Sequence, residues 1–144
     1  MATVQQEGMG NISDGTTGFF GVGIGQAGDD NMVNLTQKGD NNESGITQGE
    51  NQCNCSGSIG SFVPVSDNMA TVLQEGNANS SKVEQYSDMN TADVMQLGSF
   101  NESTMLQTEG TLNSAILIQN GDGHSAVLEQ MGNGNISNVT QGNL

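Results

Sequence analysis

The sequence predicts an all-β fold, a β-solenoid of stacked strand–turn–strand coils, and three observations carry this prediction. Glutamine recurs from Gln74 to Gln141 at intervals of 11, 11, 11, 12, 11 and 11 residues. Within each interval the recurring residue types are spaced by two, which is the period of one face of a β-strand. A glycine often follows the glutamine by two and marks a turn. Two strands with their turns therefore make one coil of about 22 residues, and stacked coils form two facing parallel sheets with amyloid-like cross-β spacing.

The repeat reads Asn-x-(Ala/Ser)-x-(Val/Leu/Met)-x-Gln-x-Gly-x-x, and its first four marked positions share one strand face. An eleven-residue period also suits a right-handed coiled coil. The spacing of two inside each unit argues against that alternative, as does one glycine per unit, which would cost a helix about 1 kcal/mol each time. None of the 16 acidic residues and neither lysine takes a marked position. Because burying an unpaired charge is costly, we expect this face to point inward.

Stacking places each glutamine above another glutamine and each asparagine above another asparagine, about 4.8 Å apart. Side-chain amides carry both a donor and an acceptor, so identical amides can hydrogen-bond along a ladder. The residues that we expect to form the ladders and to carry polymerisation are Gln26, Gln37, Gln48, Gln74, Gln85, Gln96, Gln107, Gln119, Gln130, Gln141, Asn31, Asn42, Asn68, Asn79, Asn90, Asn101, Asn113 and Asn135. His124 takes one asparagine position, where we expect a hydrogen-bonding substitute.

We expect one repeat domain over residues 1–144, with 13 half-units. The repeat is irregular over 11–30, clean over 31–50, and interrupted by a loop insertion at about 57–67 that holds Pro64. Cys53 and Cys55 fill two inward positions just before the insertion; buried small residues, a metal or redox role, and an intermolecular bridge all stay open. The turn after Gln107 is one residue longer than the others.

Composition limits the partners of the chain. A net charge of −14 argues against nucleic acid and anionic membrane surfaces. No apolar run reaches the roughly 18 residues of a membrane span, so we expect no membrane insertion. A hydrophobic fraction of 33% with 3% aromatic residues favours disorder of the isolated monomer, whereas the repeat favours order on stacking. The start of the chain, MATVQQEG, lies inside the first repeat, and we interpret it as a mature form without a signal peptide.

The repeat resembles that of the curlin family, whose pattern reads Ser-x5-Gln-x-Gly-x-x-Asn-x5-Gln. It can be followed from Gln74 through Gly76 and Asn79 to Gln85, and again from Gln130 to Gln141. The resemblance implies a secreted, self-assembling subunit of an extracellular functional-amyloid (curli) fibre of the biofilm matrix, with a role in cell adhesion. It also implies a nucleator subunit, a secretion channel and a chaperone as partners. Asparagine stands where many family repeats carry serine, and major and nucleating subunits both remain possible.

The first and last units, near Val4–Gln6 and Asn135–Gln141, have no protecting helix or proline, so copies can add head-to-tail into a homopolymeric filament. The alternative is a monomeric adhesion or binding module, with calcium at turn acids such as Asp40 and Asp122, although their spacing does not match the calcium-binding repeat. We expect no enzyme, no cofactor and no metal site, since one histidine and no nucleophile–base pair are present. Outward apolar residues are either scattered surface or a stripe for lateral bundling: Leu73, Met95, Leu97, Leu106, Ile116, Ile118 and Val127.

Overall fold

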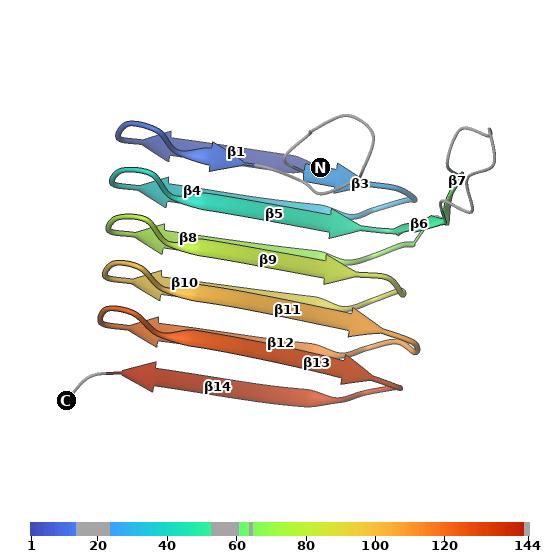
Figure 1. The fold of residues 1–144 in the computed structure, drawn as a ribbon. Helices are drawn as coiled ribbons and strands as arrows, with labels where there is room; N and C mark the ends of the chain where they lie inside the picture. The colour runs from blue at the N-terminus through green and yellow to red at the C-terminus, as the bar shows by residue number, and fades with distance from the viewer. Residues whose placement is uncertain (14–23, 53–60, 64, 143–144) are drawn as a thin grey trace.

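The computed structural model describes residues 1–13, 24–52, 61–63 and 65–142, and it is built from two parallel sheets that face each other (Figure 1). Sheet A consists, in spatial order, of β1 (Ala2–Glu7), β4 (Met32–Lys38), β8 (Met69–Glu75), β10 (Thr91–Leu97), β12 (Ser114–Asn120) and β14 (Ile136–Gly142). Sheet B consists of β13 (Ser125–Met131), β11 (Glu102–Thr108), β9 (Ser80–Gln85) and β5 (Glu43–Gln48), followed by β2 (Ile12–Ser13) and β3 (Ile24–Gln26), which both pair with β5.

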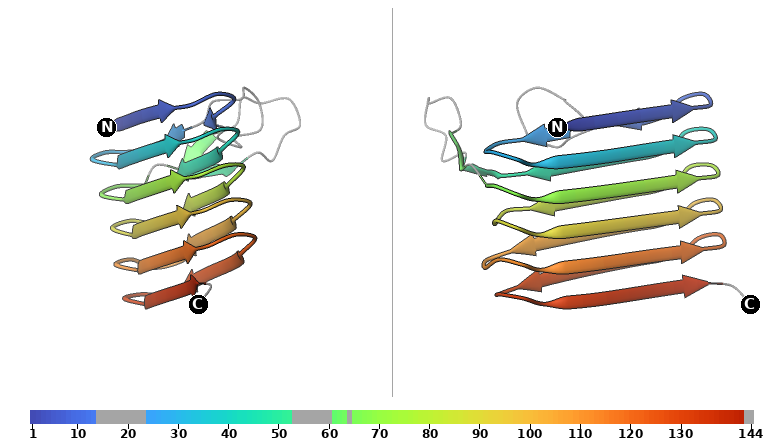
Figure 2. Two further views of the ribbon diagram at one scale, coloured as in Figure 1. Left: turned by 90° about the vertical axis from the view of Figure 1, so that its left-hand side faces the viewer. Right: turned by 180° about the vertical axis from the view of Figure 1, so that it is seen from behind.

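From β8 to β14 the chain passes from one sheet to the other at every turn, so each coil adds one strand to sheet A and one to sheet B (Figure 2). Neighbouring strands pair in register, with Val72 beside Val94 and Val94 beside Leu117. This architecture confirms the predicted β-solenoid. The described residues contain no helix, and therefore none that is long and apolar enough to cross a membrane.

Alternation along each strand builds the core. In β10 the burial pattern alternates strictly, with Ala92, Val94 and Gln96 at 0% exposure between half-buried neighbours. The aliphatic residues from the two sheets meet in one cluster that includes Leu35, Met105 and Leu117. Each rung buries little hydrocarbon, and the core is continuous only because the rungs stack.

The turns after the sheet A strands require glycine. Gly76 and Gly98 have φ values of 119° and 117°, outside the range that other residues adopt readily. A Cβ on Gly76 would lie 1.9 Å from the carbonyl oxygen of Gly98, and one on Gly98 would lie 2.2 Å from that of Gly121. Each of these turns thus packs its backbone directly on the next turn, which fixes the axial spacing along this edge of the stack.

Two short strands near the start of the chain share one partner strand. Ile12 pairs with Glu43 and Ile24 pairs with Ile46, so β2 and β3 together supply a single strand position of sheet B. The sequence hints at this, because Gly15 and Thr17 stand where a separate strand would need an apolar residue and a glutamine. Residues 14–23, which lie between the two short strands, are outside the described residues.

Two short strands after β5 stand apart from the two large sheets. β6 (Glu50–Gln52) pairs antiparallel with β7 (Ser61–Val63) as a small separate sheet. Cys53, Cys55 and Pro64 lie outside the described residues, as do residues 57–60 of the insertion expected at 57–67. Counting each strand position as one rung, the described strands build eleven rungs, six in sheet A and five in sheet B.

Candidate functional site

A ladder of buried glutamines runs through sheet A. The amide nitrogen Nε2 of each glutamine donates to the amide oxygen Oε1 of the glutamine one coil closer to the C-terminus, at 2.7–2.9 Å. The four inner members are 0% exposed. The ladder consists of Gln6, Gln37, Gln74, Gln96, Gln119 and Gln141.

Sheet B carries a second glutamine ladder with the same direction. It joins Gln26, Gln48, Gln85, Gln107 and Gln130 through Nε2 to Oε1 bonds of 2.7–2.9 Å. The same nitrogens also donate across the core, for example from Gln85 to the carbonyl oxygen of Met69 at 3.1 Å and from Gln96 to that of Ser80 at 2.9 Å. Buried amides are therefore satisfied both along each sheet and between the sheets.

Asparagines link successive turns. The backbone N–H of Asn101 donates to Oδ1 of Asn79 at 3.1 Å, and Nδ2 of Asn79 donates to the carbonyl oxygen of Gly98 at 2.8 Å. The predicted asparagines Asn31, Asn42, Asn68, Asn90, Asn113 and Asn135 occupy equivalent inward positions. The backbone N–H of His124 donates to Asn101 at 3.0 Å, and its ring Nε2 lies 3.2 Å from the carbonyl oxygen of Asn120, in the place of an asparagine amide.

Two asparagines break the pattern. Nδ2 of Asn68 and Nδ2 of Asn113 are buried without a hydrogen-bond partner among the described residues. Asn113 follows the turn that is one residue longer than the others, and Asn68 follows the segment in which β6 and β7 leave the stack.

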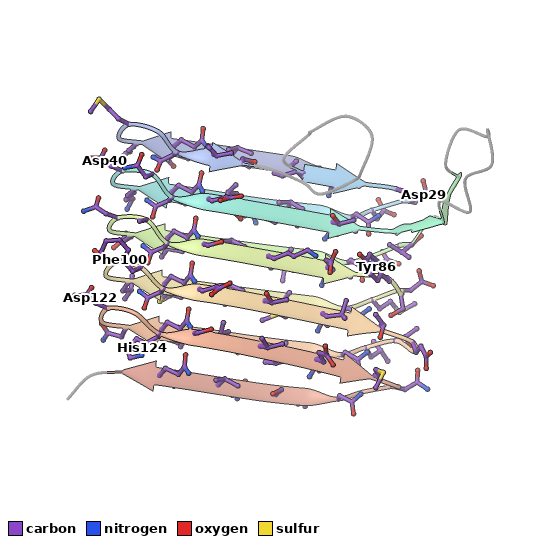
Figure 3. The ribbon with its side chains drawn as sticks, in the orientation of Figure 1. Asp29, Asp40, Tyr86, Phe100, Asp122 and His124 are labelled. Carbon is purple, nitrogen blue, oxygen red and sulfur yellow. The ribbon has the colours of Figure 1, made fainter. Side chains whose placement is uncertain are left out.

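A third ladder lies in the turns, and the sequence analysis missed it. Oδ1 of Asp40 accepts the backbone N–H of Met9 at 2.8 Å, and Oδ1 of Asp122 accepts that of Ser99 at 2.7 Å. Asn77 accepts the N–H of Asp40 in the same way at 2.9 Å. These turn residues line one edge of the stack, where Asp40 and Asp122 are labelled in Figure 3. The sequence feature that could have predicted this ladder is an Asp or Asn directly after a turn glycine.

The inward-facing side chains of the first and last rungs are more exposed than those of the inner rungs. Every residue of β1 is exposed, including the inward-facing Val4 at 47%. The amide oxygens of Gln6 and Gln26 receive no hydrogen bond from any described residue, although their nitrogens donate to the next coil. At the other end, Nε2 of Gln141 donates to the carbonyl oxygen of Ser125 at 3.0 Å with one of its two hydrogens. One end therefore offers amide acceptors and the other an amide donor.

Charged groups lie outside the core. Nζ of Lys38 lies 2.9 Å from Oε1 of Glu75, and this hydrogen bond and ion pair raise the pKa of Lys38. Lys82 pairs with Glu84 at 3.0 Å. Asp93 stands on the outer face of sheet A beside Ile116, and its partial burial raises the pKa of its carboxyl group.

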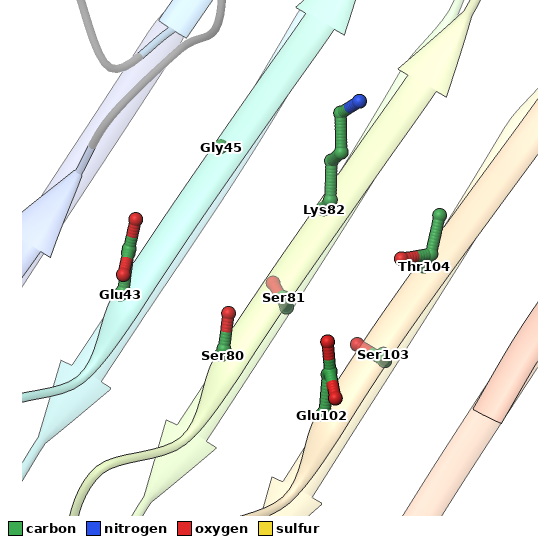
Figure 4. Close-up of a pocket in the computed structure, with 8 residues that line it drawn as sticks. All are labelled: Glu43, Gly45, Ser80, Ser81, Lys82, Glu102, Ser103 and Thr104. Atoms are coloured by element: carbon green, nitrogen blue, oxygen red, sulfur yellow. The ribbon is translucent and has the colours of Figure 1, made fainter. Parts of the chain in front are cut away.

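The outer face of sheet B holds a shallow hollow where Gly45 supplies no side chain (Figure 4). Glu43, Lys82 and Glu102 stand around it without a nucleophile–base pair among its lining residues. Among the described residues, no group of three His, Cys, Asp or Glu side chains lies close enough to hold a metal ion. Neither feature indicates a chemical site.

The family to which this repeat belongs is shown by comparison with models of known protein families. The model of the curlin associated repeat matches residues 1–39, 28–51, 66–97, 88–119 and 110–142. The chain belongs to the curlin-repeat family. Curlin proteins are structural fibre subunits rather than enzymes, and the repeats with their glutamine ladders identify this chain as a curli-like amyloid subunit. The interval between the second and third matches coincides with the part of the chain where β6 and β7 leave the curlin stack. Searches of curated proteins and of solved structures each found no match.

Proposed function

We propose that this curlin-repeat chain is the self-assembling subunit of an extracellular fibre that grows head-to-tail by continuing its ladders between molecules. The observation that carries the proposal is the direction of the amide ladders. All glutamine bonds run from Nε2 in one coil to Oε1 in the next, so the donor end of one copy fits the acceptor end of another. Because this contact joins two different surfaces and does not close, it generates a filament.

The location and partners that we propose are those that membership of the curlin family implies. A curlin fibre lies outside the cell in the biofilm matrix, where it supports adhesion, and its subunits pass a secretion channel with the help of a chaperone. A nucleator subunit starts its growth. The chain's own contribution is its last described strand: β14 is exposed on one edge, and its inward residues Ser137, Val139 and Gln141 are half-buried.

A charge placed inside the end rung tests the proposal. Val139 packs against the core on one side and faces the open end on the other. In Val139→Lys the ammonium group can reach water at the open end of a monomer, but an added copy would bury it without a partner, at a cost of several kcal/mol. We expect fibre growth, followed by thioflavin fluorescence and electron microscopy, to slow at least tenfold. The variant should also stop growth of parent fibres when added at low ratio, because its other end still docks.

Thr140→Lys is the matched control. Thr140 is the next residue of the same strand but points outward and is exposed. This control should grow like the parent chain. Equal growth of both variants would contradict the proposal, and a parent chain that stays monomeric for days at high concentration would favour the solitary adhesion module instead.

A further inference from the structure

The two ends of the stack are not related by a whole number of coils. Sheet A has six rungs and sheet B has five among the described residues, and the strands at both ends, β1 and β14, belong to sheet A. Figure 2 shows the rungs of the two sheets alternating along the stack. The described strands of each copy thus make five and a half coils. The orientation of the next copy in a fibre decides whether the rungs of both sheets continue across the boundary.

A copy added without rotation leaves a gap. If its β1 pairs with β14, sheet A continues, but sheet B misses one rung between β13 and the β2 and β3 segments of the added copy. The two edges would lie two strand spacings apart, about 9.6 Å. The backbone N–H and C=O groups along both edges would have no strand partner at every subunit boundary.

Resting on the proposed head-to-tail fibre, we propose that each successive copy is rotated by about 180° around the fibre axis, so that sheet A of one copy continues sheet B of the other. The β1 strand of the added copy then pairs with β13, and its β2 and β3 pair with β14. The strands remain parallel, because the two sheets run in opposite directions across the stack and the rotation exchanges them (Figure 1). Both sheets continue without a missing rung.

The residues that meet in this arrangement match in kind. Aligning the repeat positions places Gln6 beside Gln130 and Val4 beside Leu128 across the boundary. On the other side Gln26 meets Gln141, and Ile12 meets Ile136. Ile12 is 54% exposed and Ile136 is 79% exposed, so the contact covers two exposed apolar side chains. The free N–H of Gln141 faces the free amide oxygen of Gln26.

The turns match as well. Inside the stack a turn glycine receives the backbone of the next turn: a Cβ on Gly110 would lie 2.5 Å from the carbonyl group of Gly132. At Gly132 itself, φ is 95° and a Cβ would meet only Nδ2 of Asn135 at 3.7 Å. The rotated copy stacks its first turn on this one. Both turns have the form Gly-x-Gly, with φ values of 112° and 70° at Gly8 and Gly10 and of 95° and 66° at Gly132 and Gly134.

Disulfide cross-linking distinguishes the two arrangements. With rotation, Thr3 of one copy lies beside Val127 of the next; without rotation, Thr3 lies beside Asn138. All three side chains are exposed and point outward, and paired strands bring their Cα atoms within the range of a disulfide. Within one folded chain these pairs lie at opposite ends of the stack, so a bond between them must join two molecules (Figure 1).

Fibres of Thr3→Cys/Val127→Cys and of Thr3→Cys/Asn138→Cys would be prepared with Cys53→Ser and Cys55→Ser, oxidised, dissolved in formic acid and analysed on non-reducing gels. We expect a ladder of covalent oligomers from the first variant and monomers from the second. Oligomers from the second variant alone, or from neither variant while fibres form, would overturn the rotation and leave the fibre proposal intact. If the cysteine-free parent forms no fibre, both proposals fail together. An image reconstruction should show about 180° of rotation and about 26 Å of rise per subunit, which is five and a half strand spacings.

Discussion

Nε2 of Gln96 donates to Oε1 of Gln119 at 2.9 Å, and neither side chain is exposed to solvent. The same bond recurs on both sides, from Gln74 to Gln96 and from Gln119 to Gln141. A core with few large apolar residues is thus held by polar groups that each coil satisfies for its neighbour. A buried amide that loses its neighbour has no water to replace it, which makes stacking specific for an identical rung.

Replacing one ladder glutamine should cost far more than replacing an outward one. Gln96→Ala leaves an N–H of Gln74 and the amide oxygen of Gln119 without partners and opens a cavity. We expect a loss of about 3 kcal/mol or more in the free energy of unfolding, measured by denaturant titration of freshly prepared monomer. Gln5→Ala is the control, because Gln5 is exposed and bonds only to Glu7, and it should change stability by less than about 0.5 kcal/mol. Similar losses for both variants would contradict the role of the ladder.

The residues before the asparagines that link successive turns adopt a left-handed conformation, and several of these positions hold residues poorly suited to it. Phe100 has a φ of 60° and is 71% exposed. Because that conformation costs a residue with a Cβ about 1–2 kcal/mol, Phe100→Gly should raise stability by up to about 1 kcal/mol after allowing for the flexibility of glycine when unfolded. Phe100→Val should lower stability, since a β-branched side chain fits this region worst. Thermal unfolding of the two variants provides the comparison, and a more stable valine variant would refute this explanation.

Asp93 predicts a pH dependence with a definite sign. Burial raises the pKa of its carboxyl group in the folded chain above the unfolded value, so the folded state holds the proton more tightly. The tighter proton binding contributes to the stability of the folded state. This contribution is fully present below the unfolded pKa, near 3.9, and is lost as pH rises through the folded pKa. Asp93→Asn should therefore be more stable than the parent at pH 7 and gain less at pH 3. Glu102→Gln, at an exposed carboxylate of β11, serves as the control. If Asp93→Asn gained more stability at pH 3 than at pH 7, the result would contradict this explanation.

Turn carboxylates carry part of the negative charge that opposes assembly. Asp40 and Asp122 each accept a backbone N–H from the preceding coil, and Asn77 does so without a charge. Asp40→Asn/Asp122→Asn therefore keeps the acceptors and removes two charges. We expect this variant to polymerise faster than the parent at pH 7 and to respond less to acid, because repulsion between copies falls. The parent should assemble faster at pH 4 than at pH 8, and the reverse order would argue against electrostatic restraint.

The repeat period alone was enough to predict the strands, their inward faces and the glutamine register, because a two-residue alternation and an identical residue every eleven leave one consistent stacking. The shared partner of β2 and β3 could not be predicted in this way. A pattern search counts Asn11 and Phe20 as two starts, whereas strand pairing joins Ile12 and Ile24 to one partner strand. The backbone N–H bonds that Asp40 and Asp122 accept could not be predicted either, since turn acids in an acidic chain are equally consistent with a solvated surface.

The central claim is that amide and aliphatic ladders run without interruption from one molecule into the next. The most direct test is a cryo-electron microscopy map of the fibre at a resolution that separates strands. We expect the glutamine columns that contain Gln85 and Gln96 to cross every subunit boundary at one strand spacing of about 4.8 Å. Subunits arranged as separate bodies with a break in both columns, or fibres in which Gln85 and Gln107 face solvent, would contradict it.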